Sequence, residues 1–230
     1  MKSRNAVDGF SVVDSLPLIS EGTPKNEKVK PAVHIIGLGG AGTNILEHFH
    51  KKGIKGKYTS ITNCERPHFH EEINFIRFLP PTMENKSGEE NVWSDSDMSQ
   101  PLDTPQEIKD LFDPNDQYFL LAGLGGYTGT NMVETLTSWL LKKDMNFVVI
   151  CTLPFAFEGA SRNSYASEVV RKFRHLPNFK FFDLEAVMEV HGNNTIPVAN
   201  EHFYSIFMEN YENLKLEKLE NSLKKRGGRF

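Results

Sequence analysis

The sequence has few cysteines and no long apolar run. Cys64 and Cys151 are its only cysteines, too few for a disulfide framework, and neither stands in a metal-ligand spacing. No run approaches the roughly 20 apolar residues that span a bilayer, and the N-terminus lacks a signal-peptide pattern. With 39% hydrophobic and 24% charged residues, the 230-residue chain is expected to be a cytoplasmic globular protein without a membrane span.

The net charge of −4 is unevenly distributed. Residues 215–230 hold six basic and two acidic residues, so this segment carries +4 and the remainder about −8. Such a segment can contact acidic partners, but it is more often the solvated end of a helix. We therefore do not expect a nucleic-acid partner.

Three segments are predicted along the chain. Residues 1–30 mix Gly, Pro, Ser and Lys without a sustained period, which favours a flexible arm. Residues 31–214 form the ordered domain, and residues 215–230 form a basic helix end and tail. Within the domain, residues 80–106 are polar and punctuated by proline, which predicts a long loop.

Short apolar runs alternate with segments of helical periodicity. The runs predict strands at 33–36, 58–62, 75–79, 118–122, 147–151 and 179–182. Helices are predicted at 43–49, 108–112, 131–143, 164–175, 185–190 and 197–225. This alternation predicts an α/β fold with a doubly wound, mostly parallel Rossmann-like sheet, helices on both faces and a long amphipathic helix at the end.

The first strand runs directly into a glycine motif, residues 37–44 (GLGGAGTN). Its glycines fit the pattern G-x-G-x-x-G, in which the backbone N–H groups of Gly39, Gly40, Ala41 and Gly42 can approach a pyrophosphate at the N-terminus of a helix. The alternative is a glycine-rich turn that binds no ligand. The strand-loop-helix context favours phosphate binding.

A second glycine motif, residues 123–130 (GLGGYTGT), also lies between a buried strand and a helix. In a sheet of order 3-2-1-4-5-6 the first and fourth strands are neighbours, so the two loops would face one crevice. The phosphate ligands predicted from this loop are Gly125, Gly126, Tyr127, Thr128, Gly129 and Thr130. Because no P-loop lysine is present, backbone amides and a cation would hold the phosphates.

These two motifs and a third, residues 154–162 (PFAFEGASR), resemble the tubulin/FtsZ family. The second is similar to the signature G-G-G-T-G-[ST], and the third to the FtsZ segment P-F-x-F-E-G-x-x-R. The resemblance covers about residues 32–214, so segment 31–214 is predicted to be an FtsZ-like nucleotide-binding domain. It implies GTP or GDP as the ligand, with Mg2+, and self-association or assembly with a full-length FtsZ-like protein.

The resemblance also assigns individual positions. Glu158 and Arg162 match the residues that contact the ribose and the base, although a surface ion pair flanking a turn is the alternative. Asn44 matches an asparagine near the guanine. Glu65 stands where the family has an aspartate near the phosphates and magnesium.

The last helix matches the family's central helix, which stacks an aromatic ring on guanine and reads its edge with Asp or Asn. Phe203 as the stacking ring and Asn210 as the base reader are the predicted candidates. An aromatic stripe at helical spacing is more often a mark of core packing.

Two departures from the family pattern concern the mechanism. Tyr127 replaces a glycine of the signature loop, so its ring would stand beside the phosphates unless it points outward. The sequence ends with the central helix, and we expect the following catalytic acidic loop and the second domain to be missing. Hydrolysis requires a positioned group of that kind.

Four functions follow as alternatives. The first is a GTP-binding FtsZ-like regulator or co-assembling partner of a filament, and the second is a GTPase, active alone or completed by a partner subunit. The third is an NAD-binding Rossmann oxidoreductase, favoured only by G-x-G-x-x-G. The fourth is a structural module that binds no nucleotide.

Overall fold

The computed structural model describes residues 31–63, 70–78 and 104–227; of residues 214–227 it describes the helical backbone only. Its centre is a six-stranded, wholly parallel sheet in the order β3-β2-β1-β4-β5-β6. The strands are β1 (Val33–Leu38), β2 (Lys57–Thr62), β3 (Ile73–Arg77), β4 (Gln117–Gly123), β5 (Asn146–Leu153) and β6 (Phe179–Asp183). The predicted doubly wound sheet is therefore confirmed, including the neighbouring position of β1 and β4.

The helices that connect these strands, and the two that follow β6, lie close to their predicted positions. They are α1 (Gly39–Lys51), α3 (Gln106–Lys109), α4 (Tyr127–Lys142), α5 (Ala160–Phe173), α6 (Leu184–His191) and α7 (Thr195–Gly227), with 3-10 turns η1 (Ala156–Glu158) and η2 (Gly192–Asn194). The differences are largest at three N-termini, because α1, α4 and α5 each begin four residues earlier than predicted. In α1 and α4 the glycine motifs therefore form the first turns of the helices.

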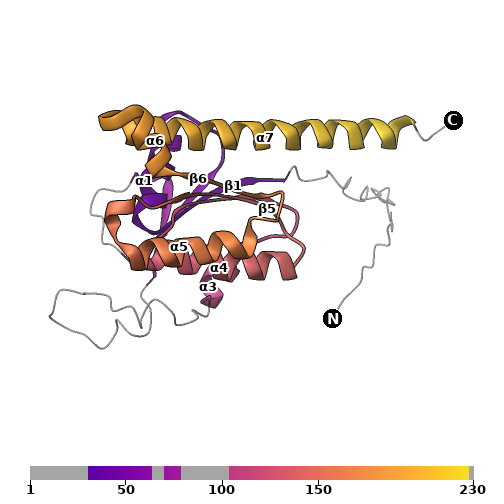
Figure 1. Cartoon of the computed structure of the whole chain (residues 1–230). Coiled ribbons are helices and arrows are strands. Elements are labelled where there is room, and N and C mark those ends of the chain that lie inside the picture. Colours follow the sequence, from indigo (N-terminus) through magenta and orange to yellow (C-terminus); the bar gives the residue numbers. More distant parts are fainter. Residues whose placement is uncertain (1–30, 64–69, 79–103, 228–230) are drawn as a thin grey trace, which may run out of the picture. The chain divides into compact units, whose positions relative to one another are not determined.

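Both faces of the sheet are covered, which explains the continuous apolar strands. Successive residues of β1 point to opposite sides: Ile35 packs with α1 and α7, and Ile36 packs with α3, α4 and α5. Figure 1 shows α6 and α7 on one side of the sheet and α3, α4 and α5 on the other. Among the described helices, none is long and apolar enough to cross a membrane.

Candidate functional site

The two glycine loops meet at the carboxyl ends of β1 and β4, which pair along their length. A Cβ atom added to Gly39 would lie 2.9 Å from the backbone N of Gly129, and one added to Gly123 would lie 2.7 Å from Cβ of Ala41. Larger residues at these positions would force the loops apart. Glycine therefore lets the first turns of α1 and α4 approach each other, as the sequence predicted; the space in front of these two turns is called the crevice below.

The glycines of the two loops divide into two groups. Gly42 and Gly129 pack against backbone: a Cβ on Gly42 would collide with the carbonyl oxygen of Leu121, and one on Gly129 would lie 2.8 Å from the oxygen of Gly123. Gly40 and Gly126 face open space, because no described atom lies within 4 Å of their Cβ positions. Packing requires the first group, whereas the second leaves room for a ligand.

The crevice also suits an anion electrostatically. Among the described residues, no side chain caps the N-terminus of α1 or α4, and neither first turn contains an acidic residue. The first N–H groups of a helix have no intrahelical acceptor, and the helix dipole adds positive charge there. Two such termini at one place form a site for a phosphate chain.

Each loop is braced by a threonine one turn into its helix. Thr43 Oγ1 donates to the oxygen of Gly39 at 2.8 Å and bonds Ser60 Oγ at 2.7 Å. Thr130 Oγ1 donates to the oxygen of Gly126 at 2.6 Å and accepts from the N–H of Gly125 at 2.9 Å. The hydroxyl of Thr130, predicted as a ligand, is thus bonded within the loop.

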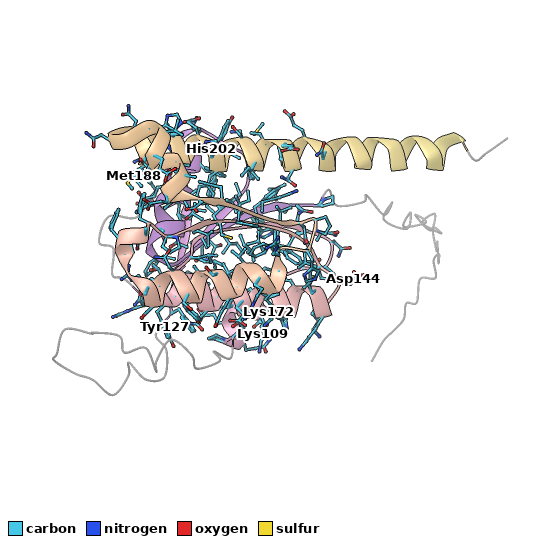
Figure 2. The ribbon with its side chains drawn as sticks, viewed as in Figure 1. Lys109, Tyr127, Asp144, Lys172, Met188 and His202 are labelled. Atoms are coloured by element: carbon cyan, nitrogen blue, oxygen red, sulfur yellow. The ribbon has the colours of Figure 1, made fainter. Side chains whose placement is uncertain are left out.

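The aromatic ring in the second loop does not crowd the crevice. Tyr127 is 6% exposed and belongs to the hydrophobic cluster that α4 and α5 form against the sheet. Figure 2 shows it on the side of the sheet opposite His202 of α7. Only the backbone of Tyr127, at the start of α4, remains for a phosphate.

The third motif lies against the second loop. A Cβ on Gly125 would be 3.1 Å from Pro154 Cγ and 3.4 Å from Arg162 Cβ. Glu158 Oε1 accepts from the N–H of Phe155 at 3.0 Å, and its Oε2 accepts from Arg162 Nη1 at 3.0 Å. The predicted ribose and base contacts thus stand beside the crevice, joined as the ion pair that was the alternative interpretation.

An exposed edge of α1 leads from the crevice to a cleft. Ala41 and Asn44 are exposed, and His48, one turn beyond Asn44, lines the cleft. Ala41 and His48 are about 10 Å apart along the helix axis. The cleft has a volume of about 640 Å3, and α6, α7 and the turn between them supply its other lining residues: His191, Asn194, Pro197, Val198, Asn200, Glu201, His202 and Ser205.

The two residues predicted on α7 do not line this cleft. Phe203 is 2% exposed and packs edge-on against Phe182, with ring centroids 5.0 Å apart, in the core under α7. To stack on a base, the ring would have to leave this core. Asn210 lies about 10 Å further along the helix and donates from Nδ2 to the oxygen of Ile206 at 2.7 Å.

The predicted metal ligand, Glu65, lies outside the described residues. The missed residues are Thr43 and Ser60 at the first loop and the start of α7 at the cleft. A regular signal marks the threonines, since each stands four residues after a motif glycine. The start of α7 gave no comparable signal, because its polar residues do not form a motif.

The fold is that of a parallel α/β protein in which the N-termini of two helices meet at the carboxyl ends of neighbouring strands. No protein-family model matches the chain. Cell division protein FtsZ of Haloferax mediterranei is 27% identical over 142 residues, which is 62% of this chain and 38% of that protein. FtsZ 1 of Methanocaldococcus jannaschii is 25% identical over 200 residues, 80% of this chain and 52% of that protein.

Solved structures show the same fold. An empty FtsZ dimer from M. jannaschii has a TM-score of 0.60 at 23% identity, covering 76% of this chain and 52% of that one. A phage tubulin, PhuZ, solved with GDP, has a TM-score of 0.57 at 16% identity, covering 80% and 56%. The sequence and structure matches together support a tubulin/FtsZ-family N-terminal domain. The chain spans about half the length, or less, of these curated relatives.

Proposed function

We propose that this domain binds GTP or GDP, with the phosphates between the first turns of α1 and α4. The convergence of the two glycine loops carries the proposal: Gly39 and Gly129 approach within contact distance while Gly40 and Gly126 leave space among the described residues. Backbone N–H groups and two helix dipoles supply the phosphate ligands. The FtsZ-type relatives and the GDP-bound phage tubulin agree with this assignment.

The nucleoside would extend from the crevice along the exposed edge of α1. Arg162 and Glu158 stand at one side of the phosphates, where the pair can open to a ribose hydroxyl or a base. Asn44 stands on the other side, on the way to the cleft at His48. We place the base in this cleft rather than against Phe203, because polar groups with hydrogen-bonding capacity line it.

We propose that Mg2+ accompanies the bound nucleotide; no residue that the structure describes is proposed to coordinate it. The backbone N–H groups of the two loops are donors and cannot coordinate a cation, so a carboxylate or the phosphates themselves would hold it. Glu65 is the residue we propose for this role. A GTP titration with and without a chelator of Mg2+ tests whether the metal takes part, and we expect weaker GTP binding when the chelator is present.

We further propose that the domain acts as a nucleotide-dependent regulator or co-assembling partner of a cytoplasmic filament. Three of its exposed large apolar residues lie at the crevice end of the sheet: Phe157, Val190 and Ile196 are 73%, 76% and 55% exposed. The curated relatives are named cell division proteins, and exposed apolar side chains that gather on one surface are typical of a surface that a partner covers.

Two experiments test these proposals. The first is chromatography of the nucleotide released when the purified protein is denatured. We expect GDP or GTP, and release of NAD alone would contradict the proposal. The second is sedimentation with GTP, alone and with full-length FtsZ. We expect nucleotide-dependent co-sedimentation that Phe157→Ser weakens and that Leu141→Ser, at an exposed leucine of α4, does not. Phosphate release in the same samples would establish the GTPase alternative.

A further inference from the structure

A clamp of side chains joins α1 to α7 beside the cleft. Glu201 Oε2 accepts a hydrogen bond from Lys52 Nζ at 2.8 Å, and Glu201 Oε1 lies 3.4 Å from His48 Nε2. Lys52 Nζ also lies over the ring of Tyr204, 4.3 Å from its centroid. The lysine is therefore held from two sides, by a carboxylate and by the face of an aromatic ring.

The same carboxylate belongs to the cleft. Glu201 is the one carboxylate among the described residues that line it, so it is the strongest acceptor there for a donor-rich ligand. The hydrogen bond from Lys52 holds the pKa of Glu201 below its usual range, as expected for a carboxylate that is paired with a cation. Both of its oxygens are nevertheless directed at α1.

The His48 side of the clamp is the weaker one. His48 Nε2 is buried and makes no hydrogen bond within the described part of the chain, and its 3.4 Å contact to Glu201 is loose. Lys52 makes the short contact and therefore decides where the carboxylate lies. The carboxylate can accept a further single hydrogen bond as it stands, but a ligand that takes both oxygens at once requires the group to turn away from α1 and to leave Lys52.

We propose that Lys52 gates the base cleft: it withholds Glu201 from the hydrogen-bond donors of a guanine base, so that closure of the clamp and base binding compete. The inference rests on the proposed function, because it assumes that the base occupies this cleft. Guanine presents an N1–H and an amino group, and a free carboxylate can accept from both.

The expected effect is modest because the pair is exposed. The side chains of Lys52 and Glu201 are 30% and 56% exposed, and ion pairs of this kind are weak and sensitive to salt. Releasing Glu201 should therefore tighten guanine-nucleotide binding by roughly two- to fivefold.

The test is a titration of the purified protein with GDP and with inosine diphosphate, which lacks the amino group. Lys52→Met keeps an apolar stem over Tyr204 and removes the charge. We expect tighter GDP binding, a smaller gain for inosine diphosphate, and no gain when Glu201→Gln is added. Lys51→Met, at the neighbouring exposed lysine, and Lys52→Arg, which keeps the charge, should both bind as the wild type does.

The outcomes separate this inference from the proposed function. Equal or weaker GDP binding by Lys52→Met, with wild-type binding intact, overturns the gate alone. Absence of GDP binding by every variant overturns the proposed function and the gate with it. Added salt should reduce the difference between wild type and Lys52→Met, since it screens the clamp in the wild type; a difference independent of salt also counts against the gate.

Discussion

An aspartate at Gly126 should change stability and nucleotide binding in opposite directions. Gly126 is the N-cap of α4, with φ −86° and ψ 153°, a conformation that aspartate adopts readily at this position. In the protein without nucleotide, the new side chain can accept from the free N–H groups of the first turn and complement the helix dipole. Together these effects stabilise the fold by about 0.5–1 kcal/mol.

The same carboxylate would stand where we place the phosphates. At about 5 Å from a phosphate charge, and with an effective dielectric constant of about 20, the repulsion is about 3 kcal/mol, which is more than a hundredfold in affinity. Gly126→Asn is the matched control, because it supplies the cap and the volume without the charge. Its nucleotide affinity should lie between those of the wild type and Gly126→Asp.

Thermal unfolding without nucleotide and a GDP titration are the two assays. We expect the melting temperature of Gly126→Asp to rise by roughly 2–3 °C. Unchanged GDP affinity would refute the placement of the phosphates. A lower melting temperature would show instead that the position is packed and does not face open space.

Three further predictions concern the packing of the site. Gly42→Ala should destabilise the domain by about 1–3 kcal/mol, because the added Cβ collides with the oxygen of Leu121, whereas Gly40→Ala should leave the free energy of unfolding nearly unchanged; urea unfolding measures both. Thr130→Val removes the two hydrogen bonds of the second loop and should cost about 1–2 kcal/mol, with Thr130→Ser restoring most of it. Phe203→Ala should cost about 3–5 kcal/mol as a core truncation; a stable variant with lost GTP affinity would restore Phe203 as the stacking ring.

The sheet was predictable from the sequence because its strands are buried on both faces. Runs such as residues 118–122 and 147–151 have no polar alternation, which is typical of strands in a parallel sheet between two helix layers. The rules for crossover connections then limit the possible strand orders. In the order that results, the first and fourth strands are neighbours, so the meeting of the two glycine loops was also predictable. The segments 1–30, 31–214 and 215–230 stay predictions.

The features that could not be predicted from the sequence depend on tertiary contacts. Glycine disfavours helix, so the sequence predicted that α1 and α4 begin after the motifs, but packing of the loops against each other makes the motifs helical. The periodicity of α7 identifies a buried stripe without showing which turn faces a ligand, so it did not reveal that Phe203 packs in the core against Phe182; its role as the stacking ring stays a prediction. The direction of the Tyr127 ring depends on the cluster under α5, which no local pattern reveals.

A titration of the purified protein, freed of bound nucleotide, with labelled GDP, GTP, ATP and NAD tests the central claim most directly. The account predicts saturable binding of GDP and GTP, weaker binding of ATP, and loss of guanine-nucleotide binding in Gly126→Asp although this variant is fully folded. Binding of NAD alone, or of no nucleotide with or without Mg2+, would contradict it.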